Sequence, residues 1–265
     1  MTDIVRSLLL GIIQGLTEFL PVSSSGHLEL LNHFLGSSES VDSDLTMVIL
    51  VHAGTAFSIL YVFRKDILEL LIGAVSTSWN EHNRFITYVI VSMIPALIIG
   101  LTLEVQVEAL FSGGIWKVGA ALIVTGLVLW ATPESRDSQS SVSMTQALLI
   151  GVAQAIAIMP GISRSGMTIA VALMLGIGRQ KAARFSFLMV LPVILGKMLL
   201  DLLSGEFLIN SQNILSVSLA FFTALFVGIL ACKWMLKIVQ QAKLKYFSWY
   251  CIAVGLIAIG VNWYG

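Results

Sequence analysis

Hydrophobic residues run along this chain in long, nearly uninterrupted stretches and do not alternate with polar ones. A membrane-spanning helix needs roughly 20 mostly apolar residues. Six stretches approach that length: 45–63, 84–104, 114–132, 185–203, 214–232 and 247–264. The pattern therefore predicts an all-α integral membrane protein with six transmembrane helices.

Two further apolar segments, 4–20 and 144–159, are shorter, and each ends at a break that contains proline, glycine and serine. Pro21 and Pro160 end their helices because proline lacks a backbone N–H and clashes with the preceding turn. A short apolar arm follows each break. Irregular backbone at membrane depth is tolerated where protein or a wet cavity covers it. We therefore expect two re-entrant helical hairpins, at 4–36 and 144–177.

The distribution of basic residues supports this arrangement. With six spans and two hairpins, Arg6 alone lies on one side of the membrane, and eleven basic residues lie on the other. These eleven are Arg64, Lys65, Arg84, Arg136, Arg179, Lys181, Arg184, Lys233, Lys237, Lys243 and Lys245. Since cytoplasmic loops carry an excess of Lys and Arg, we expect the basic loops inside and both termini outside.

The two halves of the chain resemble each other. Each holds one hairpin and three spans, and three is odd, so the second half is upside-down relative to the first. We expect residues 1–133 and 134–265 to form an inverted repeat within one membrane domain, with the hairpins meeting mid-membrane. At a shift of 140 residues, Gly11, Gln14, Ser23, Ser25 and Gly26 recur as Gly151, Gln154, Ser163, Ser165 and Gly166.

Composition agrees with this class of protein. The chain is 57% hydrophobic and 11% charged, which is typical of an integral membrane protein. Its formal net charge is zero, so nothing indicates a nucleic-acid partner.

The first break carries a carboxylate, an imidazole and several hydroxyls. Glu18 follows Gln14 by four residues, so the two share one helix face. Three serines, at 23–25, lie where one helix ends and the next begins, and a helix N-terminus favours anions. His27 opens the following arm.

The second break carries a cation. Arg164 lies between Ser163 and Ser165, and Thr168 follows one helical turn later. The arginine fork suits phosphate or carboxylate oxygens, and ionisable residues at membrane depth are candidates for a functional site. A site assembled from both breaks would hold the parts for phosphoryl chemistry: an anion clamp, a nucleophile or base, and a carboxylate that could hold a metal.

Structural interpretations compete with this one. Serines often serve close helix packing. Arg164 and Glu18 could merely neutralise each other, and His27 could be a satisfied interior histidine. His52 lies mid-span beside Gly54 and Thr55, and we interpret it as structural.

At these residues the sequence resembles the undecaprenyl-diphosphate phosphatase family, also called the bacitracin-resistance proteins. Residues 14–27 match the family's Glu/Gln-x-x-x-Glu motif and serine-rich turn, and residues 160–168 match its Pro-Gly-x-Ser-Arg-Ser-x-x-Thr motif. The resemblance implies hydrolysis of undecaprenyl diphosphate to the monophosphate with Mg²⁺ or Ca²⁺, on the outer face of the bacterial cytoplasmic (inner) membrane. That reaction recycles the lipid carrier for cell-wall synthesis and confers bacitracin resistance.

The motif match also implies site residues. Glu18, Ser24, His27 and Arg164 take the family's catalytic positions, and Glu18 and Gln14 are the expected metal ligands. Many members carry Glu where this chain has Gln14, which argues against a two-carboxylate metal site. The residues expected to surround the substrate are Gln14, Ser23, Ser25, Ser163, Ser165 and Thr168.

The expected roles follow from this resemblance. Arg164 would bind the phosphates, and Ser24 or a water would attack with His27 as general base, while His27 as nucleophile stays open. The expected partners are a polyprenyl diphosphate lipid and membrane lipids, and a homodimer stays open. The rival function is a transporter or flippase of a phosphorylated lipid, because inverted repeats with broken helices also serve alternating access.

Overall fold

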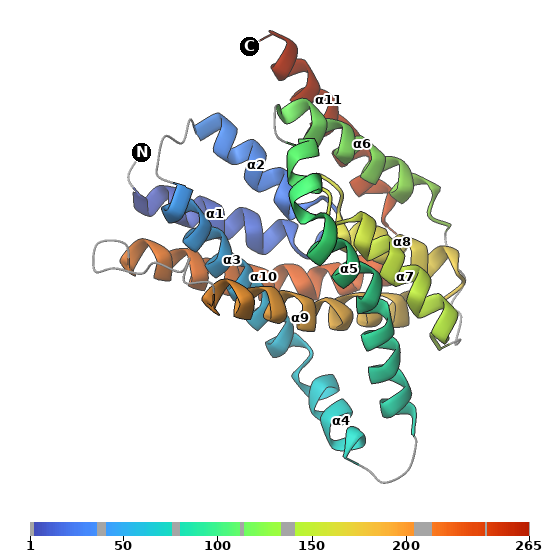
Figure 1. Ribbon diagram of the computed structural model, residues 1–265. Coiled ribbons are helices and arrows are strands. Elements are labelled where there is room, and N and C mark those ends of the chain that lie inside the picture. The colour runs from blue at the N-terminus through green and yellow to red at the C-terminus, as the bar shows by residue number, and fades with distance from the viewer. Residues whose placement is uncertain are drawn as a thin grey trace.

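The computed structural model describes residues 3–35, 41–75, 80–111, 114–133, 141–203, 214–241 and 243–264. Within these ranges the chain forms eleven helices and no strand, so the all-α prediction is confirmed (Figure 1). The helices are α1 Asp3–Thr17, α2 Ser24–Leu35, α3 Val41–Val62, α4 Arg64–Ala74, α5 Glu81–Phe111, α6 Ile115–Ala131, α7 Met144–Ile156, α8 Arg164–Met174, α9 Arg179–Leu203, α10 Ile214–Gln240 and α11 Lys245–Tyr264.

Each of the six long apolar stretches coincides with one helix. Four of these helices, α5, α9, α10 and α11, are long and apolar enough to cross a membrane. α3 passes the same test together with α4, across a bend of 73°. α6 has 17 residues and falls just short of a full span. The protein is therefore a multi-pass membrane protein, and the count of six spans stays a prediction.

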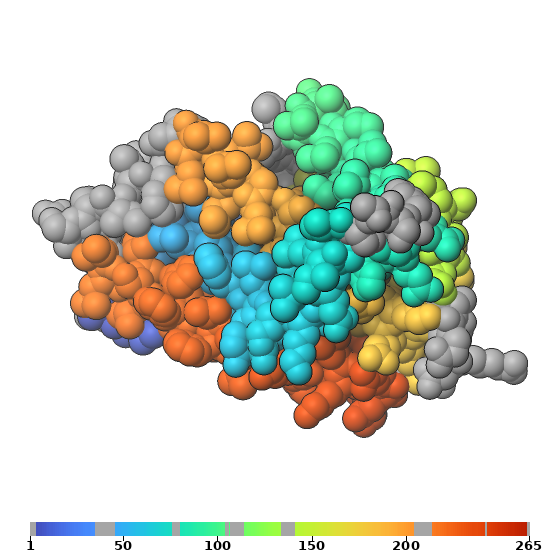
Figure 2. Space-filling model, turned by 90° about the horizontal axis from the view of Figure 1, so that it is seen from below, coloured from blue at the N-terminus to red at the C-terminus, as the bar shows by residue number. Residues whose placement is uncertain are grey.

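α4 is a helix that the span prediction does not contain. Charged residues such as Lys65, Asp66 and Glu69 interrupt its apolar positions, so the segment looks like a connection between spans. Only Leu70 is buried within it. The Asp66 carboxylate pairs with Arg184 of α9 at 2.6 Å, which ties α4 to the helix bundle. Figure 2 shows α4 beside the start of α5 on the lower face of the molecule.

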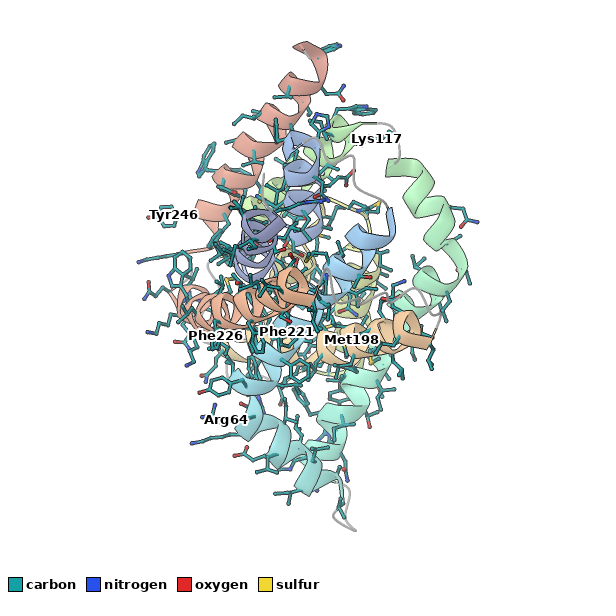
Figure 3. The ribbon with its side chains drawn as sticks, turned by 90° about the vertical axis from the view of Figure 1, so that its left-hand side faces the viewer. Arg64, Lys117, Met198, Phe221, Phe226 and Tyr246 are labelled. Carbon is teal, nitrogen blue, oxygen red and sulfur yellow. The ribbon has the colours of Figure 1, made fainter. Side chains whose placement is uncertain are left out.

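The outer surface is unusually apolar. Only 11% of the most apolar 18-residue segment of α5 is buried inside the protein. On α10, Phe226 and Leu230 are 64% and 69% exposed. Figure 3 shows Phe226 between Lys117, which lies above it, and Arg64, which lies below it. A band of exposed hydrophobic side chains of this extent indicates that lipid, and not water, surrounds it.

Glycines allow close packing between helices of the two halves. A Cβ atom at Gly11 of α1 would lie 2.7 Å from the backbone oxygen of Ala220 in α10. Gly151 of α7, which is 140 residues later, lies directly against the backbone oxygen of Ser92 in α5. Such small residues let helix backbones approach each other within a membrane. The two equivalent glycines thus each bring a helix of one half against a helix of the other.

α6 and α11 pack against each other in the same way. A Cβ at Gly119 would lie 2.6 Å from the Gly255 oxygen, and a Cβ at Gly255 would lie 2.5 Å from the Gly119 oxygen. The division of the chain into repeats at residues 133–134 stays a prediction, and residues 134–140, Arg136 among them, lie outside the described ranges.

Candidate active site

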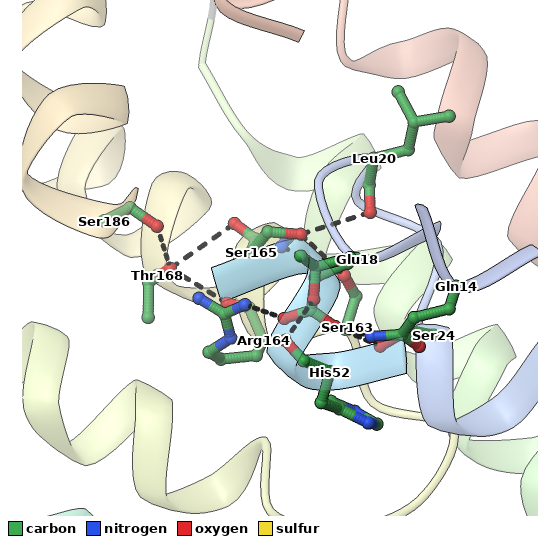
Figure 4. A network of polar contacts seen from close by, with 12 residues as sticks. Gln14, Glu18, Leu20, Ser24, His52, Ser163, Arg164, Ser165, Thr168 and Ser186 are labelled. Atoms are coloured by element: carbon green, nitrogen blue, oxygen red, sulfur yellow. Dashed lines mark hydrogen bonds and ion pairs between the residues drawn. The ribbon is translucent and has the colours of Figure 1, made fainter. Parts of the chain in front are cut away.

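The two polar breaks contact each other at the centre of the molecule. α1 ends at Thr17 and α2 begins at Ser24, while α7 ends at Ile156 and α8 begins at Arg164. A Cβ atom at Gly26 would lie 3.0 Å from the Cα of Gly161. The Ser165 hydroxyl donates to the Leu20 carbonyl at 3.1 Å (Figure 4). The starts of α2 and α8 therefore lie together.

Serine caps both helices. The Ser163 hydroxyl accepts a hydrogen bond from the Gly166 amide at 3.1 Å, and the Ser23 hydroxyl accepts one from the Gly26 amide at 3.3 Å. Both serines are buried, with 1% and 2% of their surface exposed. Ser23 has a φ of 71°, a left-handed conformation that costs a non-glycine residue energy. The equivalent serines of the two breaks thus hold equivalent helix starts in place.

Neighbouring helices anchor each break. The Thr125 hydroxyl of α6 accepts from the Ser163 amide at 3.0 Å and donates to the Gly161 carbonyl at 3.3 Å. The Cys251 thiol of α11 lies 3.6 Å from the Pro21 carbonyl. α6 therefore fixes the second break, and α11 fixes the first.

Glu18 is the centre of a polar network that both breaks supply. Its Oε1 atom forms an ion pair with Nη2 of Arg164. Its Oε2 atom accepts from the Ser24 hydroxyl at 2.7 Å and from Nε2 of Gln14 at 3.0 Å (Figure 4). The Glu18 and Arg164 side chains are 5% and 17% exposed. Four predicted site residues therefore meet, and the competing interpretation also has a basis, because Arg164 and Glu18 neutralise each other here.

Two polar atoms of this network are buried and have no hydrogen-bond partner in the part of the chain that the structure describes. They are Oε1 of Gln14 and Nη1 of Arg164. Buried polar atoms are normally hydrogen-bonded, so each orphan requires an explanation. A cation near the Gln14 oxygen and an anion near the Arg164 nitrogen would satisfy both. The site therefore suits a ligand pair such as a phosphate and a divalent cation.

The donors fit such a cation only with help from a ligand. Among the described residues, no three His, Cys, Asp or Glu side chains lie close enough together to hold a metal. Glu18 supplies carboxylate oxygens, which are the ligands that Mg²⁺ and Ca²⁺ prefer, but Gln14 turns its Nε2 donor and not its oxygen toward that carboxylate. Mg²⁺ commonly takes one or two carboxylates plus phosphate oxygens, so Glu18 would meet that minimum when a phosphate is bound, and the Gln14 oxygen would join it only after the amide turns over.

His27 is not hydrogen-bonded to Glu18, Ser24 or Arg164 in the described structure; its partners are other residues. Its Nδ1 atom is 2.8 Å from the Ser23 carbonyl oxygen, and its Nε2 atom is 2.8 Å from the Tyr250 hydroxyl. Both ring nitrogens are thus engaged by residues other than Glu18, Ser24 and Arg164. The proposed role of His27 as the base for Ser24 stays a prediction, and the group that the structure places on the Ser24 hydroxyl is Glu18.

Comparison with known proteins decides the family. The family profile "Bacitracin resistance protein BacA" matches residues 7–257, which is nearly the whole chain. This chain belongs to the BacA family. A protein of Christiangramia forsetii named undecaprenyl-diphosphatase is 49% identical over 257 residues, which is 97% of each chain. Proteins of the same name from Bacteroides fragilis and Methanobrevibacter smithii are 42% and 37% identical, over 97% and 96% of each chain. The resemblance to this family that residues 14–27 and 160–168 carry is therefore confirmed.

The remaining BacA-family motif residues differ in exposure. Of the six residues expected around the substrate, only Ser25 is exposed, and the other five are at least 97% buried. Thr168 hydrogen-bonds the Arg164 carbonyl at 2.9 Å and the Ser186 hydroxyl. In the described structure, the buried hydroxyls therefore bond to the backbone and side chains that surround the site. Their contacts with substrate stay predictions.

Two residues near the BacA-family site were not predicted to belong to it: His52, which was interpreted as structural, and Tyr250. His52 of α3 lies beside the network, interacts electrostatically with the Glu18 carboxylate, and donates from Nδ1 to the Val48 carbonyl at 2.8 Å (Figure 4). Tyr250 contacts His27 from α11. The sequence could have indicated a site role for His52, because a histidine within an otherwise apolar span needs a polar partner. Tyr250 gives no such signal, because it is one of several aromatic residues in α11.

Proposed function

We propose that this BacA-family protein hydrolyses undecaprenyl diphosphate to undecaprenyl phosphate and inorganic phosphate, and so recycles the lipid carrier and confers bacitracin resistance. The observation that carries the proposal is the contact of Arg164 and Ser24 with one carboxylate, Glu18, at the start of two helices. The relatives that match nearly the whole chain carry the name of this enzyme. Nothing in those names favours the rival function of a transporter.

The diphosphate binds where α2 and α8 begin. The first amide groups of a helix have no partner within the helix, and the helix dipole favours negative charge there. Arg164 adds a guanidinium whose Nη1 atom has no hydrogen-bond partner in the described structure. When a phosphate is bound, Arg164 turns from Glu18 toward it, because the phosphate carries more charge and accepts two parallel hydrogen bonds.

A divalent cation, Mg²⁺ or Ca²⁺, belongs to this proposal. Glu18 and Gln14 would hold it together with phosphate oxygens of the substrate. Bound there, the cation supplies positive charge that offsets the charge of the diphosphate and of its leaving group. A cation held there would also offset the charge of Glu18 when Arg164 turns to the substrate.

Ser24 is the nucleophile of the proposed reaction. Its oxygen attacks the terminal phosphorus while its proton passes to Oε2 of Glu18, which lies 2.7 Å away. The bond between the terminal phosphorus and the bridging oxygen breaks, and undecaprenyl phosphate leaves with the electron pair. A water molecule then hydrolyses the phosphoserine. His27 takes up the proton of that water, and Glu18 returns its own proton to the departing Ser24 oxygen. His27 finally releases its proton to solvent. Inorganic phosphate and the free Ser24 hydroxyl result, so atoms and charges balance.

The proposed membrane arrangement has six spans and two re-entrant hairpins in an inverted repeat of residues 1–133 and 134–265. The equivalent glycines Gly11 and Gly151, each packed on a helix of the other half, support the repeat. The asymmetric basic residues support an orientation with both termini and the active site on the outer side of the bacterial inner membrane. Membrane lipid surrounds the apolar outer surface.

The decisive experiment for function is phosphate release by the purified protein in detergent with a polyprenyl diphosphate. Detergent removes compartments, so turnover in it is chemistry and cannot be transport. We expect phosphate release that Ser24→Ala removes. A pure, folded protein that binds the lipid but releases no phosphate would contradict the proposal and favour a carrier.

A further inference from the structure

His27 and Tyr250 form a defined pair across the molecule. The rings stack with centroids 5.6 Å apart and an angle of 8° between their planes. Nε2 of His27 lies 2.8 Å from the Tyr250 hydroxyl, although 223 residues separate the two in sequence. His27 belongs to the motif of the first break, whereas Tyr250 belongs to α11, which has no part in either motif.

The hydrogen bonds of His27 determine which nitrogen carries the proton. The Ser23 carbonyl can only accept, so Nδ1 must donate to it across 2.8 Å. In the neutral ring, Nε2 is therefore the acceptor and the Tyr250 hydroxyl donates to it. In the protonated ring, Nε2 donates and the same hydroxyl accepts. A tyrosine hydroxyl serves in both directions, so one partner fits both protonation states of His27.

Tyr250 is itself held in place on both sides. Two residues before it, the Ser248 hydroxyl donates to the Gly126 carbonyl of α6 at 2.7 Å. Directly after it, the Cys251 thiol contacts the Pro21 carbonyl of the first break. The backbone that carries Tyr250 is thus fixed to α6 and to the same turn that precedes His27. The tyrosine ring itself is 45% exposed, so burial does not explain its position.

We propose that Tyr250 is a positioning residue of the phosphatase reaction. It keeps the His27 ring in one orientation and one tautomer, and because its hydroxyl is bonded to Nε2 in both protonation states, the proton enters and leaves the ring through that hydroxyl. The inference rests on the proposed function, because His27 acts in its second step. Without the hydroxyl, Nε2 loses its partner and the ring is free to turn. For histidines that bind a metal, partners that orient the ring in this way commonly contribute about 10- to 100-fold to activity, and we expect an effect near the lower end of that range here.

Tyr250→Phe is the variant that tests this proposal, because it keeps the stacked ring and removes only the hydroxyl. We expect kcat to fall about tenfold, with KM changed less than about threefold. The matched control is Tyr246→Phe, on the same helix one turn earlier and 72% exposed, which should retain wild-type activity. In a His27→Gln background, Tyr250→Phe should cause no further loss. Wild-type kcat in Tyr250→Phe, or an additional loss in the double variant, would overturn the proposal.

A spectroscopic measurement tests the contact between Tyr250 and His27 independently of whether His27 takes part in the reaction. The chain has four histidines, so ¹⁵N NMR of histidine-labelled protein can be assigned with His27→Gln. Neutral His27 should carry its proton on Nδ1 in the wild type, and Tyr250→Phe should shift its signals toward a mixture of tautomers. A wild-type ring with the proton on Nε2 would overturn the positioning role whatever the activity. Nδ1 protonation together with a fully active His27→Gln would leave the contact intact and remove His27 from the reaction.

Discussion

Glu18 and Arg164 form an ion pair although 146 residues separate them in the sequence. Each comes from a different polar break, so the pair exists only because the two breaks meet. Both side chains are largely buried, and a buried charge without a partner is costly. Each charge therefore needs the other until substrate arrives, and the pair keeps the guanidinium beside the place where we propose that phosphate binds.

The first prediction concerns Arg164→Lys. Lysine keeps the positive charge that Glu18 requires but loses the planar fork that binds two phosphate oxygens. Loss of one well-placed transition-state contact costs about a hundredfold or more in turnover. We expect a loss of that size in phosphate release, with little change in thermal stability. Activity within a few-fold of the wild type would reduce Arg164 to a structural counter-ion.

The second prediction concerns the divalent cation. Glu18→Gln should lower turnover, because it removes the base for Ser24, and should also raise the metal concentration at which the residual activity is half-maximal. Gln14→Glu should lower that concentration, because it supplies another carboxylate beside Glu18. Both effects are read from titrations of activity against Mg²⁺ or Ca²⁺. Full activity of the wild-type protein in the presence of a chelator would leave the Gln14 and Glu18 oxygens without their proposed ion.

The third prediction tests orientation with two equally exposed positions. Val75 and Trp263 are each 85% exposed, so their accessibility within the protein is matched. In intact cells, Val75→Cys should be shielded from an impermeant thiol reagent, and Trp263→Cys should react with it. The native Cys232 and Cys251 are both buried. Labelling of Val75→Cys from outside would reverse the orientation.

The fourth prediction concerns the contact between the two breaks. Gly26→Ala would place a methyl group 3.0 Å from Gly161 and push the breaks apart. Since Ser24 and Arg164 come from opposite sides of this contact, we expect at least a tenfold loss of turnover. Gly260→Ala is the control, because a Cβ at that glycine meets nothing within 4 Å. Equal activity of the two variants would show that the breaks need not touch.

Much of the fold could be predicted because lipid demands long apolar helices, and these are visible in the sequence. α4 was not predicted because charged residues such as Lys65, Asp66 and Glu69 interrupt its apolar positions, so the segment looks like a connection between spans. The two breaks were found because polar groups in an apolar chain are conspicuous, and the shift between the halves paired Gln14 with Gln154. What the sequence could not supply is which side chains face each other. Ser24 binds Glu18 and His27 binds Tyr250, and both contacts depend on how the turns and α11 are packed.

The central claim is that Ser24, activated by Glu18, attacks the phosphate. The most direct test is rapid quenching with substrate in denaturant at mildly alkaline pH, where phosphoserine and phosphohistidine both survive, followed by mass spectrometry of the peptide that contains residues 23–27. His27→Gln should accumulate phosphate on Ser24, because the first step proceeds and hydrolysis of the phosphoserine is slowed. Ser24→Ala should show none. Phosphate found on His27 in the wild type, or steady turnover of His27→Gln with no phosphoserine, would contradict the account.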